Sequence, residues 1–191
     1  GGRLGVEREA DLALLGVHAQ DLHLHLVAHL HDLLPTNGAG NAMAQGKIYI
    51  AGDIGARGMT MTKHNPRFDP PELWVLGTVG DSFAEFMAGG VAVICGFESQ
   101  RTDNVLGYRP CVGMVGGKVF FRGPHQGYSE KDARLTVPDD EEWQWLTSQM
   151  RPFLEAIGKT ELLSQLTADR GAWQILIARK PYEKAGPGRR S

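Results

Sequence analysis

Cysteine is scarce in this chain, and that scarcity excludes several classes of protein. Cys95 and Cys111 are too few for a disulfide framework, and no Cys-x-x-Cys pair points to zinc or thiol redox chemistry. Two buried thiols in a reducing cytoplasm are the favoured interpretation, with a single disulfide as the alternative. A strong excess of charge of either sign is also missing. The net charge is −2, so nothing points to nucleic acid or an anionic membrane as a partner.

Long apolar runs are absent as well. No stretch approaches the ~20 residues that cross a bilayer. The N-terminus lacks the basic start and apolar core of a signal peptide, so we expect a cytoplasmic protein. The apolar fraction of 42% still allows a core, and 191 residues correspond to about one domain. Glycine is plentiful, with 25 residues, but without the three-residue period of collagen.

These glycines belong to a repeat in residues 36–129. Its four copies are marked by Met43, Met59, Met87 and Met114. Glycines follow three of the methionines after three residues (Gly46, Gly90, Gly117) and after nine (Gly52, Gly96, Gly123). Glycines also precede three of them by seven residues (Gly52, Gly80, Gly107), and residues 63–71 form an insertion in the second copy. Self-similarity at a fixed spacing is typical of repeat architectures.

Each copy contains a short β-branched or aromatic segment between glycines, which predicts a strand. The four segments are Ile48–Ile50, Leu73–Val75, Ala92–Ile94 and Val119–Phe121. The shortest copy has sixteen residues, too few for a strand and a crossover helix. We therefore predict a mainly β fold, a right-handed single-stranded parallel β-helix (β-solenoid) over 36–129 with a helical C-terminal extension over 130–191.

The same geometry assigns roles to the repeated residues. The methionines are expected to point inward, and Asn37, Asp53 and Asp81 to cap nearby turn amides. Alternation places Ile48 and Ile50 inside and Tyr49 outside. The outward column is then entirely apolar: Tyr49, Trp74, Val93 and Phe120. Such a column needs a cover, and we expect the C-terminal helices to provide it.

Helical signals begin at Asp139, which forms a capping box with Glu142. Apolar residues recur at helical spacing up to Gly158, although Pro152 is expected to kink or split the helix. Two further helical stretches are predicted at 160–166 and about 169–179, before a basic tail at 186–191.

Residues 1–35 lack the glycine repeat, and the segment is either a divergent helix or aberrant. Leu26, Leu30, Leu33 and Leu34 favour an amphipathic helix. The segment holds five of the seven histidines, His18, His23, His25, His29 and His31. Spaced imidazoles can bind zinc or nickel, but no accompanying acidic or thiol ligand has a recognised spacing, so we predict no metal site.

No catalytic, cofactor-binding or metal-binding residue is predicted in this chain. Gly38-Ala39-Gly40 is an incomplete dinucleotide motif, and Gly46-Lys47 and Gly117-Lys118 lack the hydroxyl residue of a phosphate loop. Cys111 with His64 or His125 is a weak nucleophile pair, because the repeat already explains Cys111 structurally. A cationic patch is an open alternative to a solvated charged surface, formed by Lys63, His64, Arg67, Arg101, Arg109 and Arg122.

The repeat resembles the GXGXG repeat of the C-terminal domain of the glutamate synthase large subunit. The likeness covers about residues 37–129 and is strongest in GDSFAEFMAGGVAVICG (80–96) and VGMVGGKVFFRG (112–123). The repeat also occurs in the third subunit of formylmethanofuran dehydrogenase and in stand-alone glutamate-synthase-like subunits, including N-methylglutamate synthase. The insertion before Trp74 and the helical tail are most similar to the stand-alone glutamate-synthase type.

This resemblance implies a β-helix without an active site of its own, a scaffold subunit of an oxidoreductase. The chemistry would belong to partners: a glutamine amidotransferase subunit that releases ammonia, and an FMN-binding synthase subunit with an iron–sulfur cluster that forms glutamate from 2-oxoglutarate. Three alternatives are a scaffold like the third subunit of formylmethanofuran dehydrogenase, an N-methylglutamate-synthase-type subunit, and a free-standing β-helix binding module. A hydrolase on a β-helix is disfavoured, because its outward strand face would need clustered acidic residues.

Overall fold

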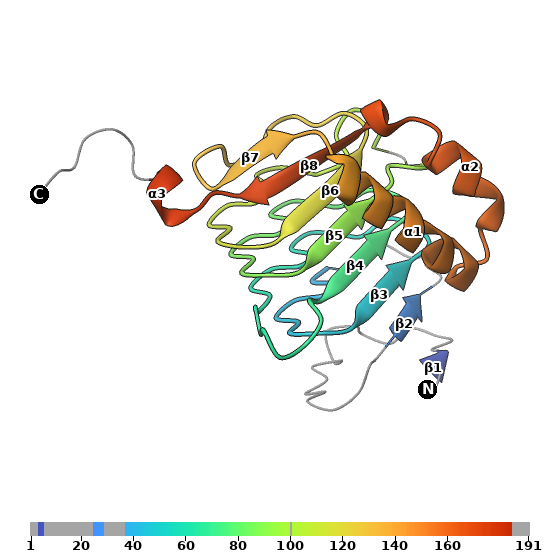
Figure 1. Cartoon of the computed structure of the whole chain (residues 1–191), viewed down its shortest axis with the longest axis horizontal. Coiled ribbons are helices and arrows are strands. Elements are labelled where there is room, and N and C mark those ends of the chain that lie inside the picture. Colours follow the sequence, from blue (N-terminus) through green and yellow to red (C-terminus); the bar gives the residue numbers. More distant parts are fainter. Residues whose placement is uncertain (1–3, 6–24, 29–36, 100, 185–191) are drawn as a thin grey trace, which may run out of the picture.

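The computed structural model describes residues 4–5, 25–28, 37–99 and 101–184. Its strands form one mixed sheet of eight strands in the order β1-β2-β3-β4-β5-β6-β8-β7 (Figure 1). Pairing is parallel from β1 to β6, and antiparallel between β6 and β8 and between β8 and β7. The strands are β1 (Leu4–Gly5), β2 (His25–Ala28), β3 (Lys47–Ile50), β4 (Glu72–Val75), β5 (Val91–Ile94), β6 (Lys118–Arg122), β7 (Ala133–Thr136) and β8 (Trp173–Ala178).

The predicted right-handed single-stranded parallel β-helix is wrong for this chain. Short strands form a mixed sheet, and helices cover one face. Two strands of the sheet come from the C-terminal third, and one of them, β8, runs antiparallel to β6 and to β7 on its two sides. The physical reason lies in residues 173–178, predicted as part of a helix. Their sequence WQILIA is rich in β-formers, and they add to the open edge of β6, with Val119 opposite Leu176. β7 then pairs with β8.

Other elements follow the predictions. β3 to β6 contain the four predicted strand segments. α1 (Asp140–Ala156) begins at Asp139 with the predicted capping box and continues past Pro152, so the proline does not split it. Residues 160–166 are helical, as η2 (Thr160–Leu162) and α2 (Leu163–Leu166); η3 (Arg170–Ala172) precedes β8 and α3 (Pro181–Lys184) follows it.

The N-terminal prediction fails where it can be compared. Leu26 lies in β2, which pairs in parallel with β3, so residues 25–28 are not helical. Leu30, Leu33 and Leu34 lie outside the described residues, as do His18, His23, His29 and His31.

Two apolar cores lie on the two faces of the sheet. One is between the sheet and the connecting loops, and includes Ile50, Val75, Ile94 and Phe121. The other lies under α1, where Tyr49, Trp74, Val93 and Phe120 meet Phe153 and other apolar residues of the C-terminal segment. Tyr49, Trp74 and Phe120 contact α1 through aromatic ring pairs. The expected cover of this column is therefore confirmed.

The connections between the parallel strands contain no helix in the described region and stack into a second layer behind the sheet. We call this layer the loop wall and define it as residues 37–44, 56–63, 81–88 and 108–115. Alternate residues have positive φ; in the third segment these are Ser82, Ala84 and Phe86. The backbone amides of these alternate residues form hydrogen bonds in opposite directions. The Ser82 amide donates to Tyr108 O of the next segment, and the Ala84 amide donates to Gly58 O of the preceding segment.

This stacking corrects the register of the second repeat. The hydrogen bonds align Thr62, not Met59, with Met43, Met87 and Met114. Met59 instead occupies the column of Gly40, and a Cβ on Gly40 would lie 2.9 Å from the Met59 sulfur. The inward direction is confirmed, because Met59, Met87 and Met114 are fully buried and Met43 packs against the same core.

Candidate functional site

The repeated Asn and Asp residues bond across segments rather than within their own turn. Asn37 Oδ1 accepts the Ala56 amide at 2.8 Å, Asp53 Oδ1 accepts the Thr78 amide at 2.6 Å, and Asp81 Oδ1 accepts the Tyr108 amide at 2.9 Å. These amides do not bond to the neighbouring backbone in the alternating pattern of the wall. The three side chains thus supply missing acceptors, and the predicted nearby capping is corrected to capping of the next segment.

Asp53 also joins a small hydroxyl cluster. Its Oδ1 lies 3.0 Å from Thr78 Oγ1, and Thr78 Oγ1 lies 2.9 Å from Ser99 Oγ. Ser99 Oγ is 3.3 Å from Asp53 Oδ2, while the Arg101 side chain donates to the Val79 carbonyl at 3.1 Å. Every hydroxyl and both carboxylate oxygens are engaged in fixing a loop junction. The sequence did not single out Thr78 or Ser99, since residues 25 and 46 positions from Asp53 carry no local signal.

Both Gly-Lys pairs are structural. Lys47 forms an ion pair with the nearly buried Glu72 at 3.1 Å and donates to Gln149 of α1. Glu72 also accepts the indole N–H of Trp74 at 2.9 Å. Lys118 forms an ion pair with Glu142 of α1 at 2.6 Å. These lysines therefore connect strand starts to the covering helix, which agrees with their exclusion as phosphate-binding residues.

The last segment of the loop wall has backbone groups that no further segment can satisfy. The C-terminal third binds three of them: Asp132 Oδ2 accepts the Gly113 amide at 2.9 Å, the Ser129 amide donates to Pro110 O at 3.1 Å, and Lys184 Nζ donates to Met114 O at 2.6 Å. Lys184 also contacts Asp132 Oδ1 at 3.2 Å. Burial alone would raise the pKa of Asp132, but hydrogen bonds from Ser129 and Gly113 and the Lys184 ammonium outweigh burial and hold this pKa below its usual value.

The thiols are inert. Both cysteines are free and fully buried, and they lie in the two separate cores, Cys111 on the loop side and Cys95 under α1, so the disulfide alternative is excluded. Burial raises the pKa of each to about 12, which keeps the thiol protonated at neutral pH. His125 contacts the rings of Phe121 and Tyr128, and His64 lies exposed at the start of the insertion. The structure therefore offers no support for a cysteine nucleophile.

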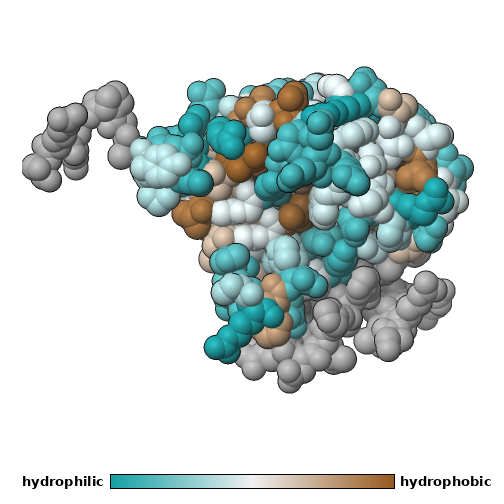
Figure 2. Space-filling model, in the orientation of Figure 1, coloured by the Kyte–Doolittle hydropathy of each residue, from teal (hydrophilic) through white to brown (hydrophobic). Residues whose placement is uncertain are grey.

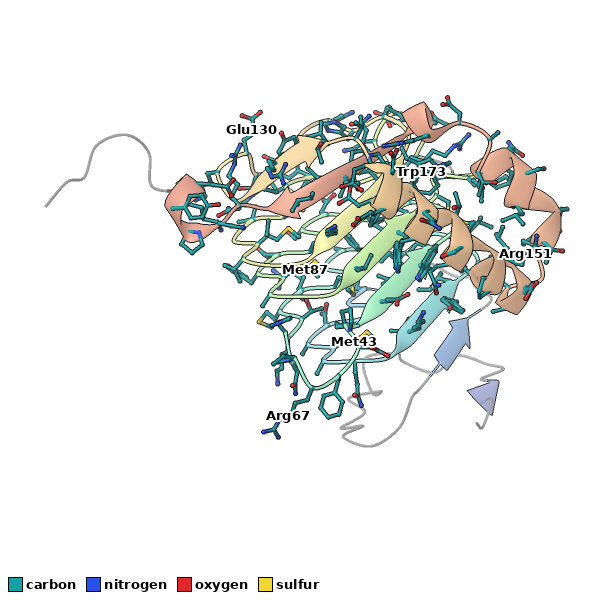
Figure 3. All side chains as sticks on the ribbon, viewed as in Figure 1. Met43, Arg67, Met87, Glu130, Arg151 and Trp173 are labelled. Carbon is teal, nitrogen blue, oxygen red and sulfur yellow. The ribbon has the colours of Figure 1, made fainter. Side chains whose placement is uncertain are left out.

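The candidate cationic residues have separate surroundings and share no common binding partner among the described residues. Arg101 is tied to Val79, and Arg122 ends β6 opposite Trp173. Arg67 lies on the insertion, which projects away from the sheet (Figure 3). Lys63, Arg67 and Arg109 are exposed, and within the described residues the four ion pairs involve none of them.

The described residues contain no group of three or more His, Cys, Asp or Glu side chains placed to hold a metal ion. None of their helices combines the length and apolar character that a membrane crossing requires. Comparison with models of known protein families and with curated protein sequences found no match.

Proposed function

We propose that this chain is a structural subunit of a glutamate-synthase-type oxidoreductase, with the chemistry carried by a glutamine amidotransferase subunit and an FMN-binding, iron–sulfur-containing synthase subunit in the cytoplasm. The proposal rests on the resemblance of the GXGXG repeat, not on the β-helix fold that the resemblance implied. One observation in the chain supports it: the polar residues of the repeat, Asn37, Asp53 and Asp81, are used to join successive backbone segments.

A scaffold role fits that observation for a physical reason. A reactive carboxylate or amide needs an oxygen free to meet substrate. Here the Oδ1 atoms of the three repeat side chains accept main-chain amides at 2.6 to 2.9 Å. The lysines of both Gly-Lys pairs are likewise engaged: Lys47 pairs with Glu72 of β4 and donates to Gln149 of α1, and Lys118 pairs with Glu142 of α1. The chemistry-bearing residue types of the repeat thus stabilise a rigid body on which other subunits can assemble.

The test is reconstitution. The chain is co-expressed with the amidotransferase and FMN-binding synthase subunits encoded in the same genome. We expect the three to co-purify, and glutamine-dependent glutamate formation from 2-oxoglutarate to require the chain. Replacing glutamine with methylamine in the same assay tests the N-methylglutamate synthase alternative. A chain that elutes alone, with activity equal in its absence, would contradict the proposal.

A matched variant tests the absence of chemistry in the chain itself. Cys111→Ala removes the one thiol that the sequence paired with a histidine, and the side chain is fully buried. If the chain is a scaffold, the assembled complex should keep its turnover once folding of the variant is verified by circular dichroism. Loss of turnover in a folded, assembled complex would assign chemistry to this chain.

A further inference from the structure

The outer surface of the loop wall carries a band of exposed apolar side chains. Backbone hydrogen bonds from Met61 to Glu85 and from Phe86 to Val112 place Ala42, Met61, Phe86 and Gly113 in one column across the four segments. Met61 is 59% exposed and Phe86 55%. The Phe86 ring lies against Gly113, since a Cβ there would sit 2.4 Å from a ring carbon. Val115, at 64% exposed, extends the band in the last segment.

The band is a feature of backbone geometry. Met61 and Phe86 have positive φ, 53° and 54°, where a side chain of this size is uncommon. The residues that follow the column in three of the segments, Thr62, Met87 and Met114, are buried. The column is thus held on a wall cross-linked by main-chain hydrogen bonds. The helix-covered face of the molecule, seen in Figure 2, is by contrast mostly polar or neutral with scattered apolar patches.

Cations border this band on both sides. Arg57 and Arg109 share a column with Ser82, four residues before the band in each segment. On the other side, Lys63 and Val115 share the column two residues after the band, with Ala88 between them. All three cations are exposed, and no ion pair in the described part of the chain uses them. Two carboxylates also lie on the wall: Asp81, which is already bound to the Tyr108 amide, and the half-buried Glu85, immediately before Phe86. The three exposed cations still outnumber them. Phe, Met, Tyr and Arg are the residue types enriched at protein interfaces.

We propose that this band is a docking surface for a protein partner whose contact patch is apolar at its centre and lined by carboxylates at its rim. The partner is a subunit of the complex proposed above, so its assignment rests on the proposed function. Apolar contact at Met61 and Phe86 supplies the affinity. The guanidinium groups of Arg57 and Arg109 pair with the carboxylates of the partner and set the approach.

The experiment measures binding of the folded chain to the purified amidotransferase and FMN-binding synthase subunits by biolayer interferometry. The doubly substituted chain Met61→Glu/Phe86→Glu is compared with Val137→Glu, a matched control at a side chain that is 63% exposed outside the wall. We expect the double variant to lose at least about 10-fold in affinity for one subunit and the control to stay within about 2-fold. Thermal unfolding verifies that both variants fold.

A salt series tests the chemistry of the partner. Affinity of the unmodified chain should fall as ionic strength rises, and Arg57→Gln/Arg109→Gln should flatten that dependence. An unchanged slope would overturn the carboxylate rim. Sedimentation of the chain alone examines a second copy as occupant: a dimer abolished by the double substitution would overturn the assignment to a partner subunit.

The remaining outcomes separate the two proposals. If the unmodified chain binds a subunit and the double variant binds equally well, the docking surface is wrong while the proposed function stands. If the unmodified chain binds neither subunit, the proposed function fails, and the partner assigned to this surface fails with it.

Discussion

Gly107 and Gly158 have almost the same backbone conformation, with φ of +68° and +70°, in opposite surroundings. A Cβ on Gly107 would lie 2.4 Å from the carbonyl carbon and oxygen of Gly80 in the preceding segment, whereas nothing lies within 4 Å of one on Gly158. Comparing the two glycines separates two energetic costs of adding a side chain. Gly158 reports the cost of the left-handed conformation alone, and Gly107 adds the cost of the close approach between two stacked segments.

Gly158→Ala should therefore cost about 1 kcal/mol, the penalty for a Cβ in the left-handed region. Gly107→Ala should cost roughly 3 kcal/mol or more, because the contact is with backbone, and the backbone must shift. Urea unfolding followed by circular dichroism measures both. Equal losses would mean that segment spacing does not require glycine at this repeat position.

Tyr49 is a second residue whose surroundings dictate a measurable property. Burial, with a smaller contribution from the charge of Glu72, raises the pKa of the Tyr49 phenol to about 12. Its pKa in the unfolded chain is about 10. The raised pKa thus stabilises the fold fully below pH 10, and this contribution is lost as the pH rises from about 10 to about 12.

We expect a late phenolate absorbance step near pH 12 that Tyr49→Phe removes, together with part of the alkaline loss of stability. Tyr182→Phe is the control, because that ring is 71% exposed on α3. Absorbance at about 295 nm measures the step. A late step that persists in Tyr49→Phe would contradict the assignment.

At the scale of elements, the ion pair between Lys47 and Glu72 joins the starts of β3 and β4 and connects them to α1 through Gln149. The Glu72 side chain is only 9% exposed. Glu72→Leu leaves the Trp74 indole N–H without its acceptor and the Lys47 ammonium without a carboxylate partner, so we expect a loss of about 3 kcal/mol. The double variant Lys47→Met/Glu72→Leu should recover part of it, because no unpaired ammonium remains.

Denaturant unfolding of the single and double variants forms the thermodynamic cycle. Asp140→Ala is the control, because its ion pair with Arg170 is exposed and should contribute 0 to about 1 kcal/mol. A double variant as unstable as the sum of its single changes would show that the pair acts independently, contrary to this prediction.

The elements were predicted unevenly, for identifiable reasons. The strands β3 to β6 were predictable because β-branched and aromatic residues alternate between glycines, and α1 because Asp139 and Glu142 form a capping box. β8 was missed because Trp173–Ala178 is apolar on both faces, and a short run of that kind shows no clear period. Only the exposed edge of β6 decides its conformation, and an edge is a property of the assembled sheet.

The candidate site was less predictable because it depends on backbone angles. The glycine spacing aligned Met59 with the other methionines. In the structure, the segment that contains Met59 and Met61, both at positive φ, stacks so that Thr62, three residues after Met59, aligns with them. The apolar band at Met61 and Phe86 follows from the same angles, which no residue pattern encodes. The burial of Cys111 could be inferred, since Cys111 already had a structural place in the repeat.

For the whole molecule, the repeat creates a problem at its end, and the C-terminal third solves it. The last wall segment exposes the Gly113 amide and the Pro110 and Met114 carbonyls, which a further segment would otherwise bind. Asp132, Ser129 and Lys184 take the place of that segment. An open edge of backbone donors and acceptors is a template for unwanted pairing, so this cap protects the last segment as well as stabilising it.

The cap makes stability depend on acid pH. Because the folded-state pKa of Asp132 is depressed, its stabilising effect is present above the unfolded pKa of about 3.9 and is lost as the pH falls through the lower folded-state value. Asp132→Asn should cost about 1 to 3 kcal/mol at pH 7, and this difference from the unmodified chain should shrink below pH 4. Asp69→Asn, at an exposed carboxylate of the insertion, is the control and should change little. Urea unfolding from pH 7 to pH 3, with light scattering for association of uncapped chains, measures both effects; a difference that stays constant with pH would show that the Asp132 charge does not stabilise the cap.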